Sequence, residues 1–245
     1  MKRLLLISVF AFVFFAAPVT HADSIAFDNA SSSNATASSL TYSLTVGSGS
    51  NRMLWTSVAF LDNSGTDFVT GITYNGTAMT RSASVRPTFT NAYQCYLYYL
   101  FAPSTGANNV VVSLSGSKTI YSSSAAYTGA AQSGAPDFST HSQANVANIS
   151  TSTNVTTANS WLISTFGDGQ NGTATKGTGL SATRGPGVFE GVLADSNAAV
   201  SAGANTTQWV NATSPTADAD FCMITAAFAP APAVTNVLFQ NNFIW

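Results

Sequence analysis

Alternation of apolar and polar side chains, rather than helical periodicity, organises this sequence. Between residues 40 and 46 every even position is apolar and every odd position is Thr or Ser, which is typical of a half-buried β-strand. Residues 53–61 are apolar on both faces, as in a strand at the centre of a sheet. Asn75 and Gly76 separate two short strand-like runs and predict a tight hairpin turn, because both residue types tolerate positive φ.

Further strand candidates recur along the whole chain, at 93–101, 110–114, 120–127, 161–166, 188–194, 207–210 and 221–228. No stretch keeps the spacing of an amphipathic helix, and the abundant Ser and Thr side chains compete with helical hydrogen bonds. About ten to twelve short strands with turn signals between them predict an all-β fold, a single antiparallel β-sandwich of the jelly-roll type. Residues 140–159 are expected to form a long surface loop with one weak strand near Val155.

The first 22 residues have the order of a cleavable signal peptide. Lys2 and Arg3 precede an apolar stretch at 4–17, and the small residue Ala22 precedes the expected cleavage site. The stretch is shorter than the roughly 20 residues that span a bilayer, and no later segment is long and apolar enough. We therefore expect a product that is secreted or held at the cell surface, with the sandwich at 23–230 and a Pro-containing break and apolar tail at 231–245.

Charge is scarce, which excludes one class of partner. Charged residues make up 7% of the chain, against roughly 25% in an average soluble protein, and the net charge is −2. Nucleic-acid binders need a basic surface to neutralise phosphates, and this chain has none. Because 45% of the residues are hydrophobic, disorder of the whole chain is not expected either.

Two cysteines, Cys95 and Cys222, lie in strand-like segments. In an oxidising compartment they can form a disulfide. The alternative is two separately buried thiols, because free Cys is among the most buried residue types. The sequence leaves both states open.

No conventional catalytic group stands out. His141 is the single histidine after cleavage, and no Ser lies in a G-x-S-x-G turn. The remaining route is a pair of carboxylates of the glycosidase kind, formed by Glu190 with Asp168 or Asp195. Glu190 interrupts an apolar strand, where a charged side chain more often faces solvent. The expectation is therefore a protein that is not an enzyme.

Two short segments carry oxygen ligands of the type that calcium prefers. One contains Asp62, Ser64 and Asp67, and the other contains Asp218 and Asp220. Asp, Asn, Ser and Gly also form ordinary turns without a metal. We expect no cofactor, with calcium as the alternative.

Tyrosines cluster in one predicted strand and suggest a sugar-binding face. Tyr96 and Tyr98 share one side of the pleat at 93–101, and Trp209 is a third candidate for stacking on a sugar ring. Aromatic rings at such positions also pack in cores, so both interpretations stay open.

The C-terminal tail is unusually apolar for a chain end, with Val237, Phe239, Phe243 and Trp245 as its main candidates for assembly. After the break at 230–232, an extended segment of this kind can add as a strand to the edge of its own sheet or of a neighbour's. An exposed apolar terminus would otherwise invite aggregation.

Several segments, in their order along residues 24–230, resemble a family of exported bacterial β-sandwich domains that recur in surface and secreted proteins. They are Ser-Asn-Arg-Met-Leu at 50–54, Val-Thr-Gly-Ile-Thr-Tyr-Asn-Gly-Thr-Ala-Met-Thr at 69–80, Leu-Tyr-Tyr-Leu at 97–100, Ala-Pro at 102–103, Gly106, Val-Val-Val at 110–112, Ala-Tyr-Thr-Gly-Ala at 126–130 and the segment 224–230. The resemblance implies a jelly-roll fold and a cell-surface or extracellular setting. It carries over no catalytic residue, and the tail from Val234 lies outside it.

Together these patterns predict a non-enzymatic, exported surface protein, a structural or adhesive subunit that self-assembles through its C-terminal strand. The alternative function is a carbohydrate-binding, lectin-like module assisted by calcium. The expected partners are therefore other copies of the chain or surface glycans.

Overall fold

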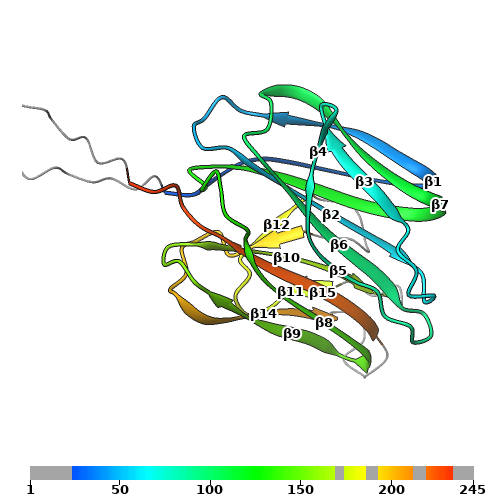
Figure 1. The fold of residues 1–245 in the computed structure, drawn as a ribbon. Helices are drawn as coiled ribbons and strands as arrows, with labels where there is room; N and C mark the ends of the chain where they lie inside the picture. Colours follow the sequence, from blue (N-terminus) through cyan, green and yellow to red (C-terminus); the bar gives the residue numbers. More distant parts are fainter. Residues whose placement is uncertain (1–23, 169–173, 186–192, 212–218, 234–245) are drawn as a thin grey trace, which may run out of the picture.

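The computed structural model describes residues 24–168, 174–185, 193–211 and 219–233 (Figure 1). Within these ranges the chain forms antiparallel sheets packed on one another, which confirms the predicted all-β sandwich. The described part contains no helix long and apolar enough to cross a bilayer. The signal peptide predicted at 1–22 lies outside the described residues.

Fifteen strands are present in the described ranges. They are β1 (Ala26–Val46), β2 (Met53–Leu61), β3 (Val69–Tyr74), β4 (Thr77–Ala78), β5 (Thr80–Val85), β6 (Tyr93–Phe101), β7 (Gly106–Thr128), β8 (Asp137–Val146), β9 (Asn148–Val155), β10 (Trp161–Asp168), β11 (Ala174–Lys176), β12 (Ala182–Arg184), β13 (Leu193–Asp195), β14 (Gly203–Asn211) and β15 (Ala219–Phe228).

The first sheet folds over on itself along its two longest strands. The first half of β7 pairs with β1 on one side and β3 on the other, whereas its second half pairs with β1 and β2. This folding brings the two ends of β1 together. Two hydrogen bonds join them: the Asn29 side-chain amide donates to the Thr45 carbonyl at 3.1 Å, and Gly47 N–H donates to Asp28 at 2.6 Å. Figure 1 shows the paired β1 and β7 turning back at one end of the molecule.

This folding makes two layers out of one sheet, and two further sheets stack beneath them. The five-stranded sheet has the order β12-β13-β10-β15-β8, and the three-stranded sheet has the order β11-β14-β9. Four layers of strands are therefore stacked, with three spaces between them (Figure 1). The described side chains form one apolar core in each of the first two spaces and two smaller clusters in the third. A jelly roll has two sheets, so the structure adds a third hydrogen-bonded sheet to the predicted architecture.

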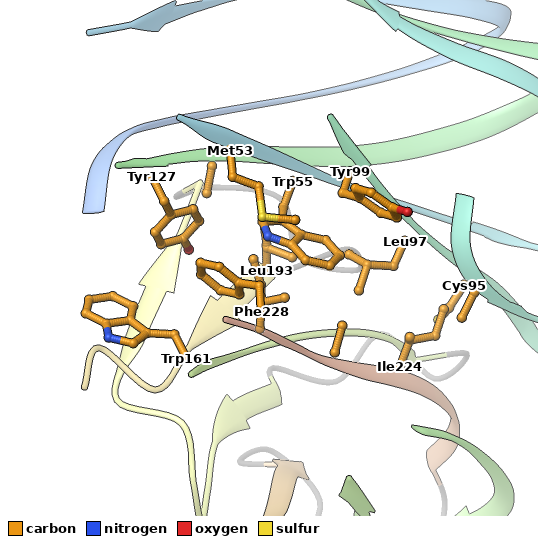
Figure 2. Close-up of a cluster of buried hydrophobic side chains, with 14 of the residues drawn as sticks. Met53, Trp55, Cys95, Leu97, Tyr99, Tyr127, Trp161, Leu193, Ile224 and Phe228 are labelled. Atoms are coloured by element: carbon orange, nitrogen blue, oxygen red, sulfur yellow. The ribbon is translucent and has the colours of Figure 1, made fainter. Parts of the chain in front are cut away.

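Strands in the two middle layers are buried on both faces. In β2 the side chain of Trp55 points toward the five-stranded sheet, whereas that of Val58 points toward the layer formed by β3 and the first half of β7. Figure 2 shows Trp55 and Tyr99 from the first sheet facing Phe228 of β15 across the central core, with Trp55 and Phe228 rings 5.7 Å apart. Residues 53–61 are apolar on both faces because both faces are covered.

The prediction of a long loop at 140–159 is wrong, although the weak strand expected near Val155 is present as the end of β9. Residues in this segment form most of β8 and all of β9, which pair with β15 and β14 respectively. Backbone pairing with β15 and β14 holds these polar strands, and only Ile149, Thr153 and Val155 of β9 are buried. The segment therefore lacked the apolar alternation by which strands are recognised.

The two ends of the described chain meet at one corner. Ala231 N–H donates to the Gly129 carbonyl at 2.8 Å, and Pro230 forms an isolated bridge with Ala130. Gly129 has a φ of 71°, and a Cβ there would lie 2.2 Å from the Ser24 carbonyl oxygen. Only glycine fits this position, because it combines positive φ with close backbone approach.

Candidate functional site

The aromatic side chains proposed for sugar stacking are core residues. Tyr96 and Tyr98 are 0% and 4% exposed, and Trp209 is 1% exposed. Trp209 packs on Phe166 with ring centroids 4.4 Å apart and donates from Nε1 to Ser164 Oγ at 2.9 Å. The structure therefore contradicts the interpretation of these three rings as a sugar-binding face, because each faces a neighbouring layer of strands rather than solvent.

The carboxylate of Asp62, the first calcium candidate, is already neutralised. Lys118 Nζ lies 2.6 Å from one oxygen, and the other accepts from Gln94, Ser64 N–H and Ser64 Oγ. Burial acts to raise the pKa of the Asp62 carboxyl, but Lys118 and Ser64 outweigh it and hold this pKa below its usual value. Lys118 also lies 4.1 Å from the centroid of the Phe68 ring. A calcium ion at Asp62 would have to displace the Lys118 ammonium, which the Phe68 ring also holds by a cation–π contact.

Asp67, from the same segment, faces a different cation. Its carboxylate forms an ion pair with Arg81 at 2.5 Å and lies 3.8 Å from Arg86. Arg81 also donates to the Tyr98 hydroxyl at 2.7 Å. Asp62 and Asp67 thus bind separate basic side chains, and the structure does not bring them together with Ser64 as one ligand set.

The second calcium candidate is only partly described. Asp218 lies outside the described residues, and Asp220 is 4% exposed and accepts from Asn145 N–H at 3.0 Å. Among the described residues no group of three His, Cys, Asp or Glu side chains is arranged to hold a metal ion.

The described carboxylates among the glycosidase candidates are buried and lie far apart. Glu190 lies outside the described residues, and Asp168 and Asp195 are fully buried on β10 and β13. Asp195 is paired in register with Ile163, five residues from Asp168, which corresponds to about 16 Å along the strand. Glycosidase carboxylates lie roughly 5–10 Å apart, so Asp168 and Asp195 do not form such a pair with each other. The predicted pairs both include Glu190 and therefore stay predictions.

Asp195 instead belongs to a buried ionic cluster. Arg184 Nε lies 2.6 Å from one carboxylate oxygen and Arg184 Nη2 lies 3.1 Å from the other. The Tyr127 hydroxyl donates to Asp195 at 2.6 Å, and Asn197 N–H donates at 2.9 Å. The Arg184 guanidinium lies 3.7 Å from the centroid of the Phe27 ring. The cluster fastens β12 and β13 onto β1 and β7, which is a structural role.

Cys95 and Cys222 form a disulfide, one of the two states that the sequence left open. Cys95 lies on β6 and Cys222 on β15, and both are fully buried in the central core (Figure 2 labels Cys95). The bond therefore joins the first sheet to the five-stranded sheet.

A small hollow was missed by the sequence patterns. It has a volume of about 140 Å³, is open to solvent and lies where β2 begins and where β6 and β15 end. Its apolar wall includes Met53, the half-buried Phe101 and Phe228, and its polar wall includes Asp137 and Thr156. These residues are far apart in the sequence, so no local motif could have found the hollow.

Buried phenols give the core a pH dependence that can be tested. Burial raises the pKa of Tyr42 to about 12, although hydrogen bonds with Ser122 and Ser124 lower it in part. An unfolded tyrosine has a pKa of about 10. Because the folded pKa is the higher one, this stabilisation is complete below pH 10 and is lost as the pH rises toward 12.

We therefore expect Tyr42 alone to make the free energy of unfolding fall by about 1 kcal/mol per pH unit around pH 11. Urea unfolding at pH 9, 10 and 11 measures this slope. The Tyr42→Phe variant serves as the control and should have a shallower slope. Equal slopes for the two proteins would contradict the assignment to Tyr42.

Comparisons with known proteins give no further guide to the site. No protein-family model matches the sequence, and no curated protein matches it. The resemblance to exported bacterial β-sandwich domains therefore stays a prediction.

Proposed function

We propose that this protein is an exported, non-enzymatic surface subunit of a structural or adhesive kind that self-assembles through its C-terminal strand. The observation that carries the proposal is the way the chain leaves the sandwich. Ala231 is tied to Gly129 by a backbone hydrogen bond, and Pro232 follows directly. The apolar cores contain described residues from all three sheets, and the proposal assigns the apolar segment 234–245 to contact with a partner.

The state of the polar candidates supports the same proposal. Asp62, Asp67 and Asp195 are each engaged by a basic side chain, and the three candidate sugar-stacking rings are buried. The disulfide between Cys95 and Cys222 favours an oxidising, extracytoplasmic compartment, where such bonds persist. These three ion pairs connect different strands of the described body or the segments directly beside them, and a structural subunit needs such connections.

Deleting residues 234–245 is expected to leave the sandwich folded and to weaken self-association. Burying four apolar side chains contributes several kcal/mol, so the dissociation constant should rise by about a hundredfold or more. Size-exclusion chromatography with light scattering measures the masses, and electron microscopy of the mature chain shows whether filaments form. Identical mass distributions for the mature and shortened chains would discard assembly through the tail.

Carbohydrate binding remains the second candidate, at a different place from the one predicted. The hollow beside Phe101 combines a partly exposed ring with Asp137 and Thr156, which is the mixture that a sugar requires. A glycan array probed with and without calcium separates the two functions. Specific glycan binding by a monomeric protein would favour this second candidate over assembly.

A further inference from the structure

Part of β1 ends the first sheet with its backbone turned to solvent. We call residues 39–44 the β1 edge. Asn75 N–H donates to the Asn109 carbonyl at 3.0 Å, so the backbone of Asn109 faces β3 rather than β1. Ser43 is the β1 partner of Asn109, and its N–H and C=O therefore point away from β7. Because direction alternates along a strand, Ser39 and Thr41 point outward as well.

Neighbouring groups confirm this direction and show where the β1 edge stops. The Thr45 carbonyl also points outward, since it accepts from the Asn29 side chain, and Gly47 N–H is bound by Asp28. These two side chains cap the end of the strand. Within the described ranges β1 pairs only with β7, so Ser39, Thr41 and Ser43 keep outward N–H and C=O groups without a strand partner.

Protein sheets normally protect such edges with charges, prolines or covering groups. The edge strand β5 carries Arg81, and on β9 the Ser150 carbonyl lies 2.7 Å from His141 Nδ1. The β1 edge has the sequence Ser-Leu-Thr-Tyr-Ser-Leu, with no charge and no proline. An unprotected edge of this length is a template for strand addition.

The side chains beside the β1 edge define what an added strand should look like. Leu40, Tyr42 and Leu44 point into the core and are at most 8% exposed, whereas Thr41 and Ser43 are exposed. A strand laid alongside would continue this layer if it were uncharged, mostly apolar on the inner face and partly polar on the outer face.

We propose that the β1 edge receives the C-terminal tail, residues 234–245, of a second copy of this chain. In an extended tail, Val237, Phe239, Phe243 and Trp245 would share one face with Thr235 and Asn241. The opposite face would carry Asn236, Gln240 and Asn242 together with Val234, Leu238 and Ile244. The tail has no charged residue. Twelve extended residues reach about 40 Å, against about 20 Å for the six-residue edge. This inference rests on the proposed function, because it names the surface that the assembling strand meets.

The donor is a second copy rather than the same molecule. Pro230 is fixed beside Ala130, and Pro232 follows one residue after the Ala231 hydrogen bond. Proline fixes φ, and Pro-rich segments act as extended spacers. A tail that continued in the direction of β15 beyond Pro232 would leave its own body, whereas pairing with its own β1 edge would require the chain to turn back after Pro232.

The first test uses two variants of the full mature chain at one position. Thr41→Pro removes an outward N–H without removing a bond to β7, and Thr41→Val keeps the N–H with a side chain of similar shape. We expect Thr41→Pro to weaken self-association about tenfold or more and Thr41→Val to leave it unchanged, by light scattering. Equal assembly by both folded variants would overturn the inference.

A second test does not depend on whether Thr41→Pro folds. Chains carrying Ser43→Cys, on the outer face of the β1 edge, are mixed with chains carrying Gln240→Cys. In an extended tail, position 240 lies on the face opposite to Phe239 and Phe243. Mild oxidation follows, and peptide mapping identifies disulfides between the two chains. Ser152→Cys, at an exposed position of β9, is the matched control in place of Ser43→Cys. A cross-link between positions 43 and 240 at least about tenfold above control supports the proposal, since disulfides need Cα atoms within roughly 7 Å.

The outcomes separate the two proposals. A mature wild-type chain that stays monomeric discards assembly and this inference with it. A chain that assembles, but without the cross-link between positions 43 and 240 of different molecules, keeps the proposed function and overturns the β1 edge as its receptor. Cross-linking confined to a single chain carrying both substitutions would likewise overturn the inference, because the tail would then cap its own edge.

Discussion

Replacing Cys95 and Cys222 together with alanine is expected to lower the free energy of unfolding by about 5 kcal/mol. The disulfide joins residues 127 positions apart, and closing a loop of that length removes much of the conformational entropy of the unfolded chain. Both sulfur atoms lie in the central core, so the substitutions also remove packed volume. Urea unfolding of the mature chain, oxidised and in each variant, measures the loss.

A reduced wild-type protein separates the entropy of the cross-link from the packing of the side chains. It keeps both sulfur atoms in the core but loses the loop constraint, so most of the destabilisation should already appear on reduction. The single variant Cys95→Ala should resemble the double variant. A reduced protein as stable as the oxidised one would show that the unfolded chain is compact enough to make the cross-link redundant.

Removing the guanidinium from the buried ionic cluster should have the next largest effect. Arg184→Ala leaves the Asp195 carboxylate fully buried, with only the Tyr127 hydroxyl and Asn197 N–H as donors. Breaking a buried pair on one side costs about 3–5 kcal/mol, because one charge stays desolvated without its partner. Chemical denaturation at neutral pH measures this cost.

Arg81→Ala is the matched control, since Arg81 also pairs with one aspartate. Its ion pair with Asp67 is about one-third exposed, and such pairs contribute about 0–1 kcal/mol. The two arginine variants should therefore differ by several kcal/mol. Similar losses for Arg81→Ala and Arg184→Ala would mean that burial does not set the energetics of these pairs.

Apolar patterns predicted the inner strands well. The candidates at 53–61 and 93–101 coincide with β2 and β6, and the candidate at 221–228 lies within β15. These strands carry apolar side chains because neighbouring layers cover both faces. The Asn75-Gly76 turn was also predicted, and both residues have positive φ in the structure.

Polar strands were predicted poorly, because they are held by hydrogen bonds to partner strands that are distant in the sequence. The first half of β1 is rich in Ser, Ala and Asn, and its partner in β7 is about 90 residues away. The strand β5 was missed for the same reason, as it is held by β6. Long-range backbone pairing leaves no periodic signal in a hydroxyl-rich sequence.

The candidate sites show a similar division. Sequence patterns selected Tyr96, Tyr98 and Trp209 as accessible rings or core residues, and only the placement of three sheets decides between these roles. The cation partners Lys118 and Arg81 lie 56 and 14 residues from their aspartates, so the oxygen-rich segment at 62–67 resembled a metal loop when considered alone. Charge scarcity made the few charged residues conspicuous but did not reveal their pairing.

The meeting of Ser24 and Ala231 beside Gly129, at one corner of the described body, has a mechanical consequence for a tethered protein. Tension applied between the ends would enter at that corner and peel strands apart in sequence, rather than shear all of them at once. The disulfide between β6 and β15 would then prevent the 127 residues that it spans from extending under load. Those residues would otherwise add roughly 400 Å to the stretched length of the chain. A protein tethered in this way would unfold under tension in small steps, and its extension would end at the disulfide.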